Sequence, residues 1–410
     1  MPLLMVLALG LGIILLIQSA WSLGDGFRFL HLVRRGRGRP RSSYTPRVGL
    51  VIPCKGTGAH FGENLERFLR QQYPDYQVVF VVASPSEPAY AFLQRRLAAR
   101  ERSDAEHTPS ASLEVAGFAD SRGEKINNLL RGVVRLRPDV EVLAFADIDA
   151  SVAADWLRCL VAPLEQPSVT VSTGFRWYLP GRGFASQLRA AWDTSIATLL
   201  DERDPKFAWG GSLAIRPEDF RRLGIAERWW ADTLSDDYTL TRAVREAGGQ
   251  IVFEPRCLVA SREELSFAEF LRWTNRQIIL TRLYAPRLWL RGLAAHVLYA
   301  AAFAFGGVAL LEFRSPLLER AAMAAILGAI LVLGAAKGWI RSLITREGFS
   351  DEMPGLKRLA SRYWQLAPLV PWVMLWNFLV ASFVRRIEWC GTTYRLDSQG
   401  RVIAVTRDAR

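Results

Sequence analysis

The chain has 410 residues, of which 50% are hydrophobic, and a formal net charge of +12 at pH 7. This length allows one domain of roughly 250 residues together with further segments. The arginine excess lies beside apolar segments, and no motif combines basic and aromatic residues for base stacking, so we exclude nucleic acid as a partner. The 4 cysteines are widely spaced, which excludes a disulfide framework and indicates reduced, mostly structural thiols. The 4 scattered histidines argue against a zinc site.

The N-terminal residues 1–24 predict a transmembrane helix. Residues 2–17 contain no charged or strongly polar side chain, and the apolar character continues to Leu23. A segment of this length can cross a hydrocarbon core, which needs roughly 20 residues. A cleaved signal peptide is the alternative, but it requires a basic leader and a small-x-small cleavage site, and neither is clear here.

Residues 25–46 form a basic linker in which Asp25 is the single acidic residue. A flexible, solvated tether fits Gly36, Gly38 and Pro40, and the arginines of this linker would also attract anionic lipid head groups. A basic flank marks the cytoplasmic side of a span. We therefore expect an integral membrane protein whose following domain is cytoplasmic. The arginines of the linker and its border are Arg28, Arg34, Arg35, Arg37, Arg39, Arg41 and Arg47.

About three further transmembrane helices are expected within residues 290–386, which gives four spans in all. The apolar stretches are residues 292–311, 321–340 and 366–384, and Pro368 and Pro371 predict a kink in the third. Strict alternation then places the tail, residues 387–410, outside the cytoplasm. Its arginines argue against that side, so either the tail departs from the rule or one segment does not span.

Residues 47–262 predict an α/β domain, because short apolar strands alternate with helical patterns. In open α/β sheets, ligands bind beyond the carboxyl ends of the strands. Pro53 and Lys55, Ser84, and Asp147 all follow such ends, which predicts a nucleotide cleft there. The expected strands are 48–53, 78–83, 142–146, 169–172, 213–215 and 251–253, and the expected helices include 62–72, 89–102, 125–134 and 237–247. No dinucleotide or P-loop motif is present.

Asp147 and Asp149 are the most informative pair of residues in this domain. They are one residue apart and follow the apolar run 142–146. Alternation along a strand directs residues i and i+2 to the same side. Two carboxylates facing one point suit a hard divalent cation, such as Mg²⁺ or Mn²⁺, that is shared with substrate phosphates. Solvated turn carboxylates are the alternative for this short pattern.

Further motifs occur in a fixed order along roughly residues 47–290. They are Lys55-Gly56, Asn64-Leu65-Glu66 with Phe68, Tyr73-Pro74 with Tyr76, Pro88-Ala89, Lys125 to Leu129, Asp147, Gly210-Gly211-Ser212, Asp236-Asp237-Tyr238 and Arg272-Trp273. The tail adds Ile387-Glu388-Trp389 and Tyr394-Arg395-Leu396. With these motifs the chain resembles the ceramide glucosyltransferases, which belong to the inverting glycosyltransferases of GT-A fold. The resemblance implies that Asp147 and its neighbour serve the metal and the diphosphate, that Asp237 is the catalytic base, and that Arg272 and Trp273 close on the donor and the acceptor.

Two positions depart from the pattern of that family. An aspartate that contacts the nucleotide base usually follows the second strand, whereas Ser84 stands there and Glu87 is the nearest carboxylate. Ser84 thus replaces the residue on which the resemblance bases recognition of uridine. The last motif begins with glutamine or arginine three residues before the Arg-Trp pair, whereas this chain has Glu269. A carboxylate would repel a diphosphate, so we expect Glu269 to point elsewhere or to have another role.

Each remaining candidate has a structural alternative. Asp237, together with Asp236, suits proton abstraction from an acceptor hydroxyl, but Ser235 or either aspartate can also cap the following helix. Gly210 and Gly211 allow a close backbone approach to the sugar, and an ordinary tight turn explains them equally well. Lys125 suits a phosphate contact as much as a surface position.

The Arg-Trp pair lies in an expected interfacial helix, within residues 263–289. Arg272 suits bidentate binding of a diphosphate, and Trp273 suits stacking on a sugar or lining an acyl channel. An amphipathic helix at the membrane surface also favours both residue types. We expect this helix both to lie on the membrane surface and to cap the site.

The sequence thus predicts a hexosyltransferase that moves one sugar from a UDP-sugar, with UDP-glucose as the first choice, to the hydroxyl of a membrane lipid such as ceramide. A processive polysaccharide synthase is the second enzymatic reading, although it would need more spans to conduct a polymer. An inactive membrane scaffold is the third reading, and the departure at Ser84 motivates it. The sequence indicates neither the sugar, nor the lipid, nor the oligomeric state.

Overall fold

The computed structural model describes residues 3–101, 109–200, 207–312, 315–349, 352 and 355–407. The chain forms two compact units. The helical unit comprises Met1–His31, Tyr178–Thr198 and Glu263–Val384, and the α/β unit comprises Leu32–Trp177, Leu199–Arg262 and Arg385–Arg410. The α/β unit is therefore assembled from three segments, of which the last is the C-terminal tail.

A seven-stranded mixed sheet forms the centre of the α/β unit, with the order β3-β2-β1-β4-β6-β5-β7. The first four strands of this order are parallel, whereas β6 pairs antiparallel with β4 and with β5. The strands are β1 (Val48–Pro53), β2 (Tyr76–Val82), β3 (Ser110–Val115), β4 (Val142–Ala146), β5 (Val169–Tyr178), β6 (Ser212–Ile215) and β7 (Gln250–Ser261).

Helices cover both faces of this sheet, because alternate residues of the central strands are buried in two different cores. On one face, Leu50 and Phe80 pack with residues of α2 (Phe61–Leu69), α3 (Pro88–Glu101) and α5 (Trp156–Val161). On the other face, Val51 and Val79 pack with α4 (Glu124–Val134), α7 (Pro217–Arg222) and α8 (Asp236–Glu246). Burial on both faces explains why β1, β2 and β4 read as continuous apolar runs. The predicted α/β architecture is confirmed.

The register of the strands brings the candidate residues to one edge of the sheet. Val51 of β1 lies opposite Phe145 of β4, and Pro53 lies opposite Val81 of β2. The carboxyl ends of these parallel strands therefore share an edge, as predicted. β6 runs in the opposite direction, with Ser212 opposite Ala146, so the segment before β6 begins at that same edge.

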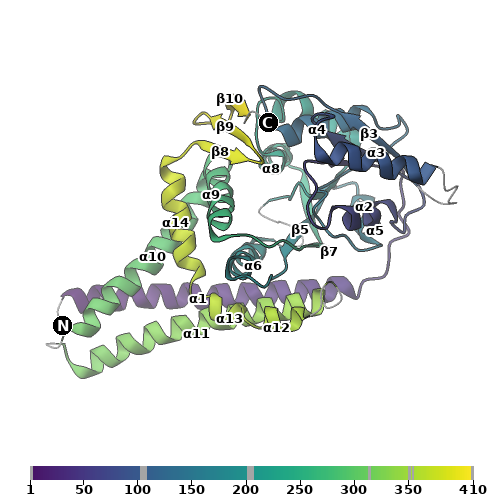
Figure 1. The fold of residues 1–410 in the computed structure, drawn as a ribbon. Helices are drawn as coiled ribbons and strands as arrows, with labels where there is room; N and C mark the ends of the chain where they lie inside the picture. The colour runs from purple at the N-terminus through teal and green to yellow at the C-terminus, as the bar shows by residue number, and fades with distance from the viewer. Residues whose placement is uncertain are drawn as a thin grey trace. The chain divides into compact units, whose positions relative to one another are not determined.

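The tail forms a second sheet of three antiparallel strands, drawn in yellow in Figure 1. Its strands are β8 (Arg386–Trp389), β9 (Thr392–Leu396) and β10 (Val402–Arg407). A two-residue loop joins β8 to β9, and both loop residues, Cys390 and Gly391, have positive φ angles of 49° and 71°. Positive φ at both positions is the mark of a type I′ hairpin turn, which matches the twist of the flanking strands.

The helical unit contains the long apolar helices. The described residues include three helices long and apolar enough to cross a membrane, namely α1 (Leu3–Arg37), α10 (Pro286–Leu311) and α11 (Leu317–Gly348). Met5 and Leu15 of α1 share an apolar core with Ala302 of α10 and Met323 of α11. The other helices of this unit are α6 (Phe184–Ile196), α9 (Phe267–Tyr284), α12 (Leu356–Ala360), α13 (Tyr363–Leu366) and α14 (Val370–Phe383).

The last apolar segment is bent rather than straight. Residues Leu356–Leu366 and Val370–Phe383 meet at an angle of 70°, and together they form a broken span or a re-entrant loop. Pro368 lies within the break and Pro371 lies in the first turn of α14. Because proline lacks a backbone N–H, these residues favour the interruption, as the sequence predicted. Counting the pair as one span gives up to four.

Candidate active site

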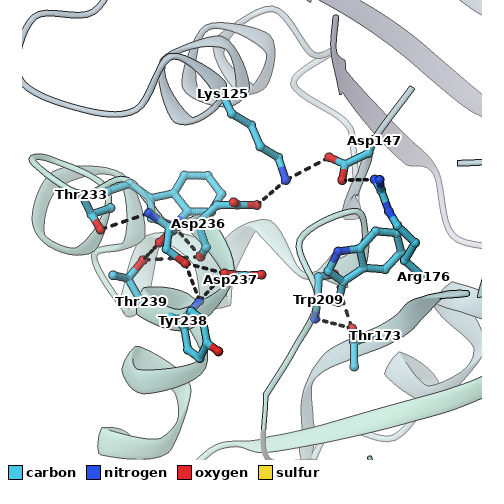
Figure 2. A network of polar contacts seen from close by, with 12 residues as sticks. Lys125, Asp147, Thr173, Arg176, Trp209, Thr233, Asp236, Asp237, Tyr238 and Thr239 are labelled. Carbon is cyan, nitrogen blue, oxygen red and sulfur yellow. Dashed lines mark hydrogen bonds and ion pairs between the residues drawn. The ribbon is translucent and has the colours of Figure 1, made fainter. Parts of the chain in front are cut away.

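An ion-paired cluster lies where β4 ends and where α4 and α8 begin. Lys125, in the first turn of α4, places its Nζ atom 2.9 Å from Asp147 Oδ1 and 3.0 Å from Asp236 Oδ2. Figure 2 shows the ammonium group between the two carboxylates. The lysine side chain is 14% exposed and that of Asp236 is 8% exposed. Lys125 is therefore a buried counter-ion of the cluster and not a surface lysine.

Arg176 on β5 completes the cluster from the other side of Asp147 (Figure 2). Its Nη2 atom lies 2.7 Å from Asp147 Oδ2 and 2.6 Å from Asp149 Oδ1, and its Nη1 atom lies 2.7 Å from Asp149 Oδ2. The guanidinium also lies over the ring of Trp209, 5.2 Å from its centroid. The two aspartates thus converge on one cation, as their spacing predicted.

Arg176 was not among the site residues predicted from the sequence. It stands among aromatic residues that look like core, and its charge within a buried strand is the one local sign of another role. Its place in the site follows from the strand pairing, because Thr173 lies opposite Leu213 and the antiparallel register directs Arg176 toward Gly210. Trp209, which supports the guanidinium, was also missed.

Gly210 and Gly211 are required by close contact with the acidic residues. A Cβ atom at Gly210 would overlap the carboxylate of Asp236, and one at Gly211 would overlap Asp147 and the Trp209 ring. The backbone N–H of Asp147 also donates to the Gly211 carbonyl at 3.2 Å. The two glycines therefore allow this segment to pass directly beside the carboxylates, so an ordinary tight turn does not account for them.

The two aspartates at the start of α8 occupy different environments. Asp236 is buried at 6% exposure, whereas Asp237 is half-buried. Asp237 Oδ1 accepts hydrogen bonds from Ser235 Oγ at 2.5 Å and from the Tyr238 N–H at 2.7 Å. Ser235 is the residue that caps the helix, since its hydroxyl accepts from the Tyr238 N–H at 3.3 Å. Helix capping is thus mainly the role of Ser235, although Asp237 accepts a hydrogen bond from the same Tyr238 N–H.

The charges of the cluster shift one another's pKa values. Burial raises the pKa of Asp236 to about 6, although Lys125 opposes this effect. Burial also acts to raise the pKa of Asp147, but Lys125 and Arg176 outweigh it and hold that pKa below its ordinary value. Burial acts to lower the pKa of Lys125, and Asp147 and Asp236 outweigh it, so the lysine keeps its proton. Removing one partner from a buried pair of this kind costs about 3–5 kcal/mol.

The other predicted donor residues of this unit lie at neighbouring strand ends. Pro53 ends β1, and Lys55 just beyond it forms an ion pair with Glu124 at 2.7 Å. Ser84 follows β2, where its hydroxyl contacts Ser86 Oγ at 2.9 Å. Glu87 is buried at 4% exposure and does not present an open carboxylate at this edge. The ion pairs that form the cluster involve neither Ser84 nor Glu87.

Within the helical unit, α9 carries the Arg-Trp pair. The Trp273 ring makes edge contacts with Tyr178 and Trp192, at centroid distances of 5.2 and 5.3 Å, while Arg272 is exposed. Glu269 forms a capping box with Ser266, because its carboxylate accepts from the Ser266 N–H at 2.7 Å while the Ser266 hydroxyl accepts from the Glu269 N–H at 3.3 Å. The glutamate thus has a local helix-capping role, which accounts for its departure from the family pattern.

The Asp147 and Asp149 carboxylates have the donor chemistry that a hard divalent cation requires. Among the described residues, no group of three or more His, Cys, Asp or Glu side chains is arranged to hold a metal. The two aspartates nevertheless converge on a common point, and the Arg176 guanidinium stands there. The donor set therefore fits Mg²⁺ or Mn²⁺ if substrate oxygens supply further ligands and Arg176 gives way.

This arrangement makes Arg176 a competitor of the metal. Replacing Arg176 with glutamine removes a positive charge from the point where the carboxylates converge, so Mn²⁺ should bind the nucleotide-free protein at least about 10-fold more tightly. Titration of Mn²⁺ followed by electron paramagnetic resonance measures this affinity directly. Arg131→Gln, on α4 and paired with Glu114, is the matched control. An Arg176→Gln protein that binds Mn²⁺ no more tightly than the control would contradict this competition.

The sequence identifies the family of this chain. Glycosyl transferase family 21 matches residues 14–402, which is most of the length. The chain belongs to glycosyl transferase family 21. Family membership, together with the mixed sheet described above, confirms both the GT-A fold and the resemblance to ceramide glucosyltransferases at the level of the family. It makes this protein a glycosyltransferase with helices apolar enough to cross a membrane.

Several solved structures are similar to this family 21 protein. The mannosyltransferase PcManGT from Pyrobaculum calidifontis, in complex with GDP-Man and Mn2+, is 18% identical over 92% of this chain and 97% of its own, with a TM-score of 0.46. GalNAc-T7 with UDP, GalNAc and Mn2+ is 14% identical over 59% of this chain and 48% of its own, with a TM-score of 0.42. TarS 1-349 of S. aureus is 14% identical over 87% of this chain and 98% of its own, with a TM-score of 0.36. These scores are low, so the assignment rests on the family match.

Proposed function

We propose that this family 21 protein is an inverting glycosyltransferase that moves one sugar from a UDP-sugar to the hydroxyl of a membrane lipid. UDP-glucose is the first donor to test and ceramide is the first acceptor. The observation that carries the proposal is the cluster of Lys125, Asp147, Asp149, Arg176 and Asp236 at the carboxyl edge of the sheet. The apolar helices support a lipid acceptor, because such an acceptor does not leave the bilayer.

The leaving diphosphate must be neutralised as the bond to the sugar breaks. Asp147 and Asp149 would hold Mg²⁺ or Mn²⁺, which supplies positive charge to the diphosphate oxygens when bound. Arg176 has a planar guanidinium that suits bidentate contact with phosphate once it leaves the carboxylates. Lys125 keeps its proton and stays between Asp147 and Asp236, so it preserves the spacing of the two acidic residues.

The acceptor hydroxyl must lose its proton as it attacks the anomeric carbon. We assign this role to Asp237, because it is half-buried and not committed to an ion pair, whereas Asp236 is held by Lys125. The hydrogen bonds from Ser235 and from the Tyr238 N–H fix the orientation of the Asp237 carboxylate. A carboxylate held in a fixed orientation suits general-base catalysis, which requires the base to lie within hydrogen-bond reach of the acceptor hydroxyl when the acceptor is bound.

The Arg-Trp pair of the helical unit would serve the same reaction. Arg272 is exposed and offers a guanidinium suited to a diphosphate. Trp273 is held by two aromatic rings, which gives it a fixed orientation for contact with the acceptor. Because Glu269 is engaged in helix capping, its carboxylate is directed to Ser266 and would not oppose an approaching diphosphate.

We place the α/β unit in the cytoplasm, on the basis of the arginines in the last turn of α1. Nucleotide sugars are typically cytosolic, so this side is also required by the proposed donor. A fusion that ends near residue 150 should report a cytoplasmic location with a phosphatase–fluorescent protein pair. A signal from the opposite side would be incompatible with a cytosolic donor.

Purified full-length protein, incubated with a panel of UDP-sugars and a lipid extract, tests the proposed function. We expect one UDP-sugar to release UDP in the presence of lipid and to yield a product heavier than a lipid by one hexose, as read by mass spectrometry. Asp147→Asn is the matched control and should yield no product. Products that carry several sugars in one chain would favour a processive synthase, and no UDP release with any donor would favour an inactive homologue.

A further inference from the structure

The C-terminal sheet is bound to the α/β unit by hydrogen bonds of its last strand. The Val402 N–H donates to the Asp232 carbonyl at 2.8 Å, and Arg401 forms an antiparallel bridge with Thr233. Arg407 at the far end of β10 pairs with Asp120 at 3.2 Å and lies over the Phe118 ring. The sheet is thus fastened at both ends of one strand, beside the segment that leads to Asp236 and Asp237.

A second group of contacts comes from β9 and reaches the start of α4. The Glu124 N–H donates to the Tyr394 hydroxyl oxygen at 3.2 Å. Lys55 Nζ donates to Thr392 Oγ1 at 3.3 Å and pairs with Glu124 at 2.7 Å. Tyr394 and Thr392 are each 2% exposed. Glu124 directly precedes Lys125, so these contacts hold the helix end that carries the central lysine of the cluster.

The burial of its apolar residues indicates that the C-terminal sheet depends on contact with the rest of the α/β unit. The apolar side chains of Ile387, Leu396 and Val402 are at most 7% exposed. A three-stranded sheet of this size does not enclose such residues by itself, because short strands need a partner surface to bury an apolar face. The C-terminal sheet therefore folds against the rest of the α/β unit, and both belong to one compact unit.

We propose that the C-terminal sheet is a structural part of the active site and that Tyr394 and Thr392 are positioning residues. The sheet holds two segments at once, namely the start of α4 with Lys125 and the segment before Asp236. The hydrogen bond from the Gly123 N–H to the Thr233 carbonyl, at 2.8 Å, joins the same two segments directly. Loss of the tail contacts would therefore loosen the spacing between Lys125 and Asp236.

This arrangement also fixes the side of the membrane on which the tail lies. Because the tail and the α/β unit fold together, the chain between Arg262 and Arg385 must cross the membrane an even number of times. α10 and α11 are each long and apolar enough to cross a membrane, and together they would supply two crossings. With these two crossings, we infer that the bent pair α12–α14 enters and leaves from the same face, as a re-entrant segment does. The arginines of the tail consequently lie on the same side as the basic end of α1, and the conflict noted in the sequence is removed.

The native cysteine at the hairpin turn allows a direct test of the side of the membrane on which the tail lies. Cys390 is exposed, whereas Cys54, Cys159 and Cys257 are buried. A membrane-impermeant maleimide should label Cys390 in sealed vesicles of one orientation only. Glu218→Cys in a Cys390→Ser background places the reference label on α7, where the side chain is 75% exposed. Labelling of both sites from the same side supports the proposal, and labelling from opposite sides overturns it.

The positioning role needs a readout that a general loss of stability does not produce. Thr392→Val keeps the shape of the side chain but removes the acceptor for Lys55, whereas Thr392→Ser restores it. Tyr394→Phe removes the acceptor for the Glu124 N–H, and Tyr90→Phe on α3 is its matched control. We expect Tyr394→Phe and Thr392→Val to speed hydrogen exchange in residues 123–128 by about 3- to 10-fold, with Thr392→Ser and Tyr90→Phe unchanged.

The effect on catalysis rests on the proposed function, whereas the labelling and exchange measurements do not. In the active enzyme, Tyr394→Phe should raise the donor KM about 3- to 10-fold at an unchanged melting temperature. Unchanged exchange at the start of α4 in both Tyr394→Phe and Thr392→Val would overturn the positioning role. Faster exchange in a protein that uses no UDP-sugar would leave the positioning intact and refute the proposed function instead.

Discussion

Replacing Asp237 with asparagine should lower turnover by about 10²–10⁴-fold while nucleotide binding stays near the wild-type value. The carboxylate is the proposed acceptor of the proton from the attacking hydroxyl, and an amide cannot take that proton. Its oxygen still accepts the hydrogen bonds that Ser235 and the Tyr238 N–H donate to Asp237, so the start of α8 should keep its structure. Initial rates with saturating donor and acceptor, together with calorimetric titration of UDP, measure the two effects separately.

Asp236→Asn is the matched control because it lies next to Asp237 and also removes one carboxylate. Asp236 is paired with Lys125 and buried, so its loss should weaken the cluster and reduce turnover less than the loss of Asp237. If Asp237→Asn keeps near-normal turnover and Asp236→Asn does not, the base is Asp236. Its raised pKa of about 6 would suit that role.

Replacing Asp147 with asparagine should abolish the Mn²⁺-dependent part of UDP binding without unfolding the protein. The substitution removes one of the two carboxylates on which a metal would depend, while Lys125 keeps Asp236 and Arg176 keeps Asp149 as partners. Each remaining cation thus retains a counter-ion, so the fold should persist. UDP affinity measured with and without Mn²⁺, beside a thermal unfolding curve, separates the loss of binding from any loss of structure.

Asp149→Asn is the comparison for this experiment, and we expect a smaller effect. Asp149 is more exposed than Asp147, with 42% against 21% of its side chain accessible. Asp147 also forms the ion pair with Lys125. An Asp147→Asn protein with unchanged Mn²⁺-dependent UDP affinity would refute the metal assignment, whatever the result for Asp149→Asn.

The central strands could be predicted from the sequence because they are buried on both faces. β1 and β4 have the bounds expected from their apolar runs, and β5 and β7 extend further than expected. The edge strand β3 (Ser110–Val115) was missed because half of its residues are polar and none is fully buried. The strands of the tail were missed because they are held by hydrogen bonds to residues distant in the sequence, such as Asp232 and Glu124.

The site was predictable where the sequence carries a local pattern and not where distant segments meet. The spacing of Asp147 and Asp149 predicted that they face a common point, and they do. The identity of the cation at that point was not predictable, because Arg176 arrives from a strand that pairs antiparallel with β6. The role of Glu269 could have been read from the pattern Ser266-x-x-Glu269, which is a capping-box signature. The contacts of Lys125 could not be predicted, because they depend on how the starts of α4 and α8 lie relative to each other.

The anomeric configuration of the product is the measurement that tests the central claim most directly. In the proposed reaction the acceptor hydroxyl attacks from the face opposite the diphosphate, with Asp237 as the single protein base and no covalent glycosyl-enzyme. An α-linked UDP-sugar should therefore give a β-linked glycolipid, which proton NMR of the purified product identifies by its coupling constant at the anomeric position. The same assay with Asp237→Asn should give almost no product. An α-linked glycolipid made by the wild-type protein would contradict the mechanism.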